Sequence, residues 1–273
     1  MVEKEYLDIL KTWTADQNDV ILAAYPKTGG TWISTIIDYV FHDGDIEKAD
    51  AKGDIHNRVP FLENVYPEGK PPTGAQKLDK MKPPRFAKVH LGYNPVRKQV
   101  EEDKAKFIVV FRNPKDTIVS YYHYYRANKS MGFFQGDFHE FFELFREKRL
   151  RYGDIIEWFE GWWRNVGRLN VLPIRYEEIK VDLEKHVRSI AEFCGKDFSD
   201  DVIQRITTAC TLKEMKKNPA TNLSQLGGGL FDNNISNFIR KGEVGDWKNW
   251  MTQEESDYID ERCKNLAAMG FPV

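Results

Sequence analysis

A run of five apolar residues, 20–24, leads directly into a loop with one proline, one lysine and two adjacent glycines. An uninterrupted apolar run of this length is typical of a parallel strand that is buried on both faces. The proline removes a backbone donor, and Gly29 and Gly30 let a ligand approach the backbone closely. Thr31 is expected to cap the helix whose apolar spacing follows. Because the N-terminus of a helix attracts anions, the segment predicts a P-loop-like phosphate site to which Lys27 adds a cation.

This loop differs from the Walker A phosphate loop, in which a Lys-Ser or Lys-Thr pair opens the helix. Here Lys27 precedes the glycines, and no such pair follows them. The loop therefore predicts phosphate binding, but it does not by itself indicate a nucleoside triphosphate or a magnesium ion. An ordinary Pro/Gly turn between a strand and a helix is the alternative that this segment leaves open by itself.

Three further runs, 85–89, 107–111 and 171–175, have the apolar character of buried strands. Strands that alternate with helices predict an α/β fold, here one domain over residues 1–273 with a mainly parallel central sheet flanked by helices. The connection 42–84 is expected to be a loop with room for one short helix. Apart from the helix after Thr31, the expected helices are 1–12, a segment opened by Asn113 and Pro114, 138–149, 155–166, 177–194, 199–209 and 252–268.

The charge balance and the hydropathy pattern exclude several classes of protein. With 40 basic and 42 acidic residues the net charge is −2, whereas a general nucleic-acid-binding protein is distinctly basic. No apolar stretch is long enough for a transmembrane helix, and the N-terminus has no signal-peptide pattern, so a cytoplasmic protein is expected. Cys194, Cys210 and Cys263 lack metal-site spacing and are expected to be reduced thiols.

Three side chains that can bind or transfer charged groups follow three of the predicted strands. Lys27, His90 and Arg112 each come after an apolar run, and ligands of parallel sheets bind at the carboxyl ends of the strands. Adjacent parallel strands would therefore bring all three into one crevice. Ser120, about two helical turns beyond Arg112, could bracket a second anionic group with it. The Arg-Lys-Gly segment 240–242 offers two more cations beside a flexible backbone.

Each of these residues also has an ordinary structural explanation. A lone histidine after a strand is more often structural than catalytic, Arg112 can pair with Asp116 along a helix, and the Arg-Lys pair can be solvated surface charge. Trp32, Tyr176 and Leu212 can form a wall against a nucleotide base or simply pack in the core. The other histidines lack the spacing of metal ligands, and no Gly-x-Ser-x-Gly elbow indicates a serine hydrolase.

Six segments, in the same order, resemble those of the cytosolic sulfotransferases. Residues 25–32 are similar to the family's loop for the 5′-phosphosulfate, and residues 111–123 to its segment for the 3′-phosphate. Residues 240–249 resemble the family's C-terminal signature. The match extends over about residues 18–252, and six ordered segments are far more specific than any one of them. The other three segments are 58–63, 88–91 and 213–219.

The resemblance implies transfer of a sulfuryl group from 3′-phosphoadenosine 5′-phosphosulfate (PAPS) to a hydroxyl or amine of a small molecule. The product would be adenosine 3′,5′-bisphosphate (PAP), and no metal is required. His90 would be the general base, Lys27 would stabilise the leaving oxygen, and Lys88 would steady the sulfuryl oxygens or the acceptor. Ser120 would hold the 3′-phosphate and could restrain Lys27. The residues implied to bind PAPS are Lys27, Thr28, Gly29, Gly30, Thr31, Trp32, Arg112, Ser120, Tyr176, Thr211, Leu212, Phe238, Arg240, Lys241 and Gly242.

The acceptor is implied to be a phenol or another flat hydroxyl compound. Phe61 and Tyr124 match positions that line an apolar pocket in relatives, and Lys88 and His90 would contact the same molecule. Asn128 lies near the pocket end that tunes amine preference. A neutral side chain there gives no strong case for a catecholamine.

The chain departs from the family pattern at several positions. Gly30 stands where a threonine is usual, so one hydroxyl contact to phosphate is lost, and Leu212 replaces a frequent aromatic that would stack on adenine. In the C-terminal dimer motif, Gln253 replaces an apolar valine. A monomer and a homodimer therefore both stay open.

The sequence supports three other functions less well. A nucleotide kinase or NTPase would carry a Walker A loop, and a membrane-bound Golgi sulfotransferase would carry an anchor. A protein that binds PAP without catalysis would preserve most of the motifs, but it would have no need of His90 and Lys27. Neither a nucleic acid nor a membrane is expected as a partner.

Overall fold

Parallel strands form the centre of the fold in the computed structural model, which describes residues 13–64, 74–222, 224 and 231–273. Within these residues the sheet has four strands in the order β2-β1-β3-β4. Every neighbouring pair is parallel, which confirms the predicted sheet. The strands are β1 (Val20–Ala24), β2 (Phe86–Val89), β3 (Lys106–Phe111) and β4 (Val171–Arg175).

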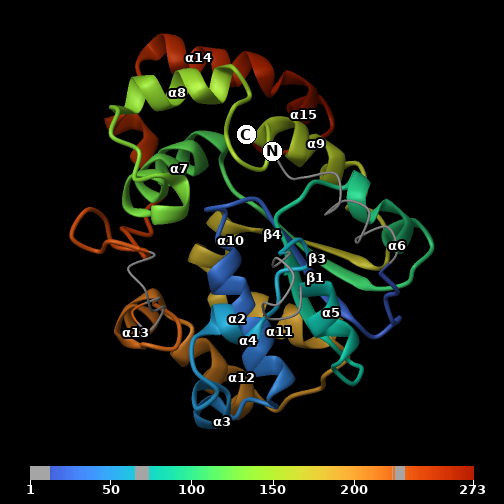
Figure 1. The fold of residues 1–273 in the computed structure, drawn as a ribbon. Helices are drawn as coiled ribbons and strands as arrows, with labels where there is room; N and C mark the ends of the chain where they lie inside the picture. The colour runs from blue at the N-terminus through green and yellow to red at the C-terminus, as the bar shows by residue number, and fades with distance from the viewer. Residues whose placement is uncertain (1–12, 65–73, 223, 225–230) are drawn as a thin grey trace.

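Helices cover both faces of this sheet, as Figure 1 shows. Because successive strand residues point to opposite faces, Leu22 and Ile108 pack in one core while Ala23 and Val109 pack in the other. The first core includes side chains of α2 (Gly30–Phe41), α11 (Leu183–Phe193) and α12 (Asp200–Ala209). The second includes side chains of α7 (Pro114–Ala127), α8 (Phe138–Arg146), α9 (Ile155–Trp163), α14 (Gln253–Arg262) and α15 (Lys264–Ala268).

A buried ion pair joins the residues that precede β1 and β2. Asp19 is fully buried, and its carboxylate accepts from Arg85 Nη2 at 2.5 Å and from Arg85 Nε at 2.9 Å. Removing one partner of such a pair costs about 3–5 kcal/mol because the other charge stays buried. The pair lies at the N-terminal ends of β1 and β2, and because these strands are parallel, their carboxyl ends lie at the same edge of the sheet.

Several predicted helices are shorter than expected or divided. Residues 177–194 form α10 (Tyr176–Val181) and α11, because Asp182 leaves helical geometry and its side chain caps α11 by accepting from Lys185 N at 3.0 Å. Residues 252–268 likewise form α14 and α15, which meet at Cys263. Helix α13 (Leu212–Lys217) was not predicted.

The connection 42–84 contains more helix than predicted. It forms α3 (Ile46–Asp50), α4 (Ile55–Arg58) and α5 (Gly74–Asp79), and helices this short show no clear periodicity. The predicted helix 1–12 lies outside the described residues. Short helical turns elsewhere are η1 (Asn94–Val96), α6 (Arg97–Glu101), η2 (Lys129–Met131) and η3 (Asp246–Asn249).

The three cysteines carry free thiols, as predicted. None of the helices in the described ranges is both long and apolar enough to span a bilayer.

Candidate functional site

A cavity of about 600 Å³ lies at the carboxyl ends of the strands. Lys27, His90 and Arg112, which follow β1, β2 and β3, all line it, so the predicted convergence on one crevice is confirmed. Thr28 and Thr211 are the two predicted site residues outside this lining. The other predicted residues that line it are Gly29, Gly30, Thr31, Trp32, Phe61, Lys88, Ser120, Tyr124, Tyr176, Leu212, Phe238, Arg240, Lys241 and Gly242.

The loop between β1 and α2 depends on glycine. Gly29 has φ 111°, and a Cβ atom there would lie 2.9 Å from Cδ2 of Tyr176. Gly29 is also the N-cap of α2, so the prediction that Thr31 caps this helix is wrong. The first amides of a helix have no intrahelical partner. They are therefore available to an anion, as a phosphate site at this loop would require.

Thr28 and Thr211 have local structural roles in the described structure. The Thr28 hydroxyl and amide both donate to the carbonyl oxygen of Tyr25, at 2.8 and 3.2 Å. Thr211 caps α13 by accepting from Glu214 N at 3.4 Å. Each hydroxyl therefore forms a hydrogen bond with a residue three positions away in the chain.

Lys27 places its ammonium among aromatic rings. Its Nζ atom lies 4.1 Å from the ring centroid of Phe238 and 5.1 Å from that of Tyr124. It donates weakly, at 3.4 Å, to the Phe238 carbonyl oxygen. Burial, and then the charges of Arg112 and Arg240, lower its pKa to about 7. An anion in this cavity would therefore meet an ammonium that lacks a carboxylate partner among the described residues.

His90 is held in one tautomer. Its Nδ1 atom lies 2.5 Å from the carbonyl oxygen of Ala24, and because a carbonyl can only accept, Nδ1 carries the hydrogen. Burial lowers the pKa of His90 to about 3, so the ring is neutral and Nε2 retains a lone pair. The His90 amide donates to Glu63 Oε1 at 2.8 Å, which fixes the residue from a second side.

Lys88 is a second amine in the cavity, and it is buried. Its Nζ atom lies 3.9 Å from the ring centroid of Phe61, and Phe61 pairs with Lys88 in an isolated parallel bridge. Burial lowers the pKa of Lys88 to about 7, although Glu63 and Asp54 oppose this shift.

Arg112 connects the phosphate loop with the C-terminal signature. Its Nη1 and Nη2 atoms donate to the carbonyl oxygens of Lys27 and Glu243, at 3.1 and 3.2 Å. Its guanidinium lies 4.3 Å from the ring centroid of Tyr176. Asp116 instead accepts from backbone amides of the signature segment, so the possible pairing of Arg112 with Asp116 does not form.

Arg240 and Lys241 share one buried carboxylate. Arg240 Nη2 and Lys241 Nζ each lie 2.7 Å from an oxygen of Asp246. Burial alone would raise the pKa of Asp246, but hydrogen bonds from Lys241 and Arg240 outweigh it and lower the pKa. The alternative of solvated surface charge is therefore wrong for Arg240, whereas Lys241 pairs with Asp246 and stays 43% exposed. Gly242 has φ 72°, and a Cβ there would lie 2.5 Å from Leu212 Cδ1.

Trp32 belongs to both the core and the cavity wall. Its Nε1 donates to the carbonyl oxygen of Cys210 at 2.7 Å, and its ring meets that of Tyr176 edge-on with centroids 5.6 Å apart. Both rings line the cavity.

Several residues of the cavity wall were not predicted from the sequence. His56 donates from Nδ1 to Asp54 Oδ1 over 3.0 Å, and its Nε2 lies 3.4 Å from Thr31 Oγ1. The sequence offered one indication that His56 belongs to the site, namely its position just before the segment 58–63. The other missed lining residues include Asn64, Arg151, Tyr152 and Phe231.

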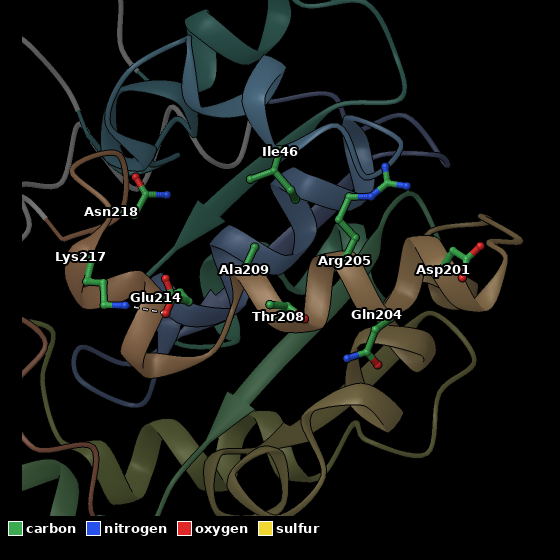
Figure 2. A pocket seen from close by; sticks show the side chains of 9 residues that line it. All are labelled: Ile46, Asp201, Gln204, Arg205, Thr208, Ala209, Glu214, Lys217 and Asn218. Carbon is green, nitrogen blue, oxygen red and sulfur yellow. Dashed lines mark hydrogen bonds and ion pairs between the residues drawn. The ribbon is translucent and has the colours of Figure 1, made fainter.

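A second hollow, of about 680 Å³, lies along α12 and α13 (Figure 2). Its charged side chains include both signs, and Lys217 Nζ pairs with Glu214 Oε1 at 2.8 Å. It contains none of the predicted site residues. In the described ranges, no group of His, Cys, Asp and Glu is placed to hold a metal ion.

The sequence is similar to known sulfotransferases along nearly its whole length. The family model for the sulfotransferase domain matches residues 17–270. Sulfotransferase 1C2 of Oryctolagus cuniculus is 36% identical over 252 residues, which are 92% of this chain and 84% of that protein. Sulfotransferase 1A1 of Bos taurus is 36% identical over 256 residues, 94% of this chain and 85% of that protein.

The fold is similar to solved structures of such proteins. The structure of mouse sulfotransferase SULT7A1 complexed with PAP has a TM-score of 0.76 and 29% identity, covering 97% of this chain and 90% of that one. Retinol dehydratase in a complex with retinol and PAP has a TM-score of 0.82 at 24% identity, covering 96% of this chain and 86% of that one. The second comparison shows the fold alone.

Proposed function

This chain belongs to the sulfotransferase family and is a PAPS-dependent sulfotransferase, and we propose that it sulfates a phenolic hydroxyl with His90 as the general base. One observation carries the proposal. A neutral histidine of fixed tautomer lines a single cavity together with three cations, Lys27, Lys88 and Arg112, that have no ion-pair partner among the described residues. Sulfuryl transfer, like phosphoryl transfer, builds negative charge on the leaving oxygen, so positioned cations beside a proton acceptor favour it.

The residues present fit PAPS. The Nε atoms of Arg112 and Arg240 are buried, and in the described structure neither has a hydrogen-bond partner. Both residues line the cavity, where an anion would satisfy them. The amides that open α2 would hold the 5′-phosphosulfate, and Arg112, Ser120 and residues 240–242 would hold the 3′-phosphate. When bound, PAPS supplies the sulfuryl group.

His90 and the two amines would divide the proton and charge transfer. His90 would accept the phenolic proton at Nε2, because Nδ1 already donates to Ala24. A bound anion near the ring favours the imidazolium and raises the pKa of His90. Lys27 would stabilise charge on the leaving oxygen. Its ammonium is available for this role because its hydrogen bond to the Phe238 carbonyl oxygen is long, at 3.4 Å. Lys88 would steady the sulfuryl oxygens.

The proposed acceptor is aromatic because rings surround His90. Phe61 and Tyr152 lie with ring centroids 5.0 and 5.1 Å from that of His90. Phe231 and Tyr124 continue the wall. A cytoplasmic location is part of the proposal, because the segments that match are those of cytosolic sulfotransferases.

Transfer of labelled sulfate from PAPS to a panel of phenols, steroid alcohols, alkyl alcohols and amines tests the acceptor class. We expect transfer to phenols at the highest kcat/KM. Transfer confined to alkyl alcohols or amines would overturn the phenolic assignment.

A further inference from the structure

The side chains that line the cavity carry charge of one sign. None of the lining residues in the described ranges is an aspartate or a glutamate. The lining cations are Lys27, Lys88, Arg112, Arg151, Arg240 and Lys241. In the proposed reaction, the phosphates of PAPS would bind the cations near α2 and the C-terminal signature. The sulfuryl oxygens would bind Lys88. Arg151 is left without a role in the proposed reaction.

Arg151 belongs to the His90 end of the cavity. Its Cζ atom lies 5.2 Å from the ring centroid of Tyr152, whose ring in turn lies 5.1 Å from that of His90. The charge of Arg151 also acts on the pKa values of His90 and Tyr124. One aromatic ring therefore separates the guanidinium from the proposed base.

The neighbours of Arg151 are paired, whereas Arg151 has no ion-pair partner in the described part of the chain. Arg146 binds Glu143 and Arg149 binds Glu147, each at 3.0 Å. Lys148 binds Glu157. The unpaired cation of this basic run is thus the one that lines the cavity.

The backbone presents Arg151 in a fixed way. Its amide donates to the hydroxyl oxygen of Tyr125 at 2.8 Å, and its carbonyl oxygen accepts from the Tyr121 hydroxyl at 2.9 Å. The next residue, Tyr152, has φ 72°, a conformation that costs a non-glycine residue about 1–3 kcal/mol. Such strain persists where the surrounding structure holds it, and here it brings two adjacent side chains to the cavity.

We propose, on the basis of the sulfotransferase function proposed above, that the acceptor is a hydroxyaryl carboxylate, with its hydroxyl at His90 and its carboxylate on Arg151. A guanidinium binds a carboxylate through two parallel hydrogen bonds. The phenyl ring would lie beside Tyr152, since that ring spans the distance between the two groups. A protonated amine at the same end would meet Lys88 and Arg151 in the lining. The carboxylate of Glu63 interacts with both cations, but it lies outside the lining and accepts from the His90 amide.

Three phenols of similar length test this assignment: 3-(4-hydroxyphenyl)propionate, its methyl ester and tyramine. With the wild-type enzyme we expect kcat/KM for the carboxylate to exceed that for the ester by roughly 10-fold or more, the worth of a charged hydrogen bond. In Arg151→Gln the two values should become equal, mainly through KM. In Arg151→Glu, tyramine should become the best of the three.

Arg149→Gln is the matched control, because Arg149 is a nearby exposed cation outside the cavity lining. It should keep the wild-type order of the three phenols, and PAP affinity should be unchanged in every variant. An unchanged carboxylate-to-ester ratio in Arg151→Gln would overturn the inference and leave the proposed function standing. Failure of the wild-type enzyme to sulfate any phenol would overturn both.

Discussion

The Nδ1 atom of His90 donates to the carbonyl oxygen of Ala24 at 2.5 Å, although 66 residues separate the two in the chain. Ala24 is the last residue of β1, and His90 follows the last residue of the neighbouring β2. The parallel pairing therefore sets the tautomer of the proposed base. Because Nδ1 carries the hydrogen, Nε2 keeps its lone pair, and no carboxylate is needed to fix this tautomer.

We predict that His90 stays neutral, with hydrogen on Nδ1, throughout pH 5–8 in the ligand-free enzyme. Burial is the main reason, since it lowers the pKa of His90 to about 3. Side-chain ¹⁵N chemical shifts, assigned with His90→Gln, measure both properties. A titration near the ordinary histidine pKa of about 6.5 would contradict the prediction.

Affinity for PAP should fall as pH rises from 7 to 9. The pKa of Lys27 is lowered to about 7 by burial and by Arg112 and Arg240, so its ammonium is lost over this range. A bound anion raises that pKa, and binding above pH 7 should therefore take up a proton. Calorimetry in two buffers of different ionisation enthalpy measures the uptake. In Lys27→Met the pH dependence should become shallower, and an unchanged slope would assign it to another group.

Arg112→Ala should weaken PAP binding by roughly 10- to 150-fold, the worth of a charged hydrogen bond. The Nε atom of Arg112 is buried without a described partner, and an anion would supply one. Arg164→Ala removes an exposed cation at the C-terminus of α9, 3.9 Å from Glu160, and should leave PAP affinity unchanged. Equal affinity of Arg112→Ala and the wild type would remove Arg112 from the phosphate site.

Gly29→Ala should lower both the free energy of unfolding and PAP affinity. The alanine would have to adopt φ 111°, and its Cβ would lie 2.9 Å from Tyr176. Gly53→Ala isolates the conformational part, because Gly53 has φ 90° and a Cβ there would meet no atom within 4 Å. We expect Gly53→Ala to cost about 1 kcal/mol and Gly29→Ala to cost more. Denaturant unfolding compares them, and equal costs would show that the Tyr176 contact relaxes freely.

The strands and their convergence could be predicted from the sequence. Buried parallel strands are continuous apolar runs, and residues 20–24 and 171–175 form strands with the predicted bounds. The carboxyl ends of such strands meet at one edge whatever the helices do. The meeting of Lys27, His90 and Arg112 therefore required no knowledge of side-chain packing.

The hydrogen-bond partners could not be predicted, because they come from distant segments. Arg112 binds carbonyl oxygens 85 and 131 residues away along the chain, while its helical neighbour Asp116 is taken by other amides. In the sequence, Arg151 is one more charge in a basic run. Its place in the cavity lining depends on hydrogen bonds between its backbone and two tyrosine hydroxyls of α7. Thr31 looks like a cap, but Gly29 replaces it through backbone conformation alone.

Sulfuryl transfer by His90→Ala, measured beside PAP binding by the same protein, tests the central claim most directly. We expect turnover of a phenol to fall by about 10²–10⁴-fold, the usual contribution of a general base. PAP affinity should stay within a factor of about two of the wild type, since the phosphate contacts lie elsewhere in the cavity. Full turnover in His90→Ala with PAP binding intact would contradict the account, because the proton would then leave by another group.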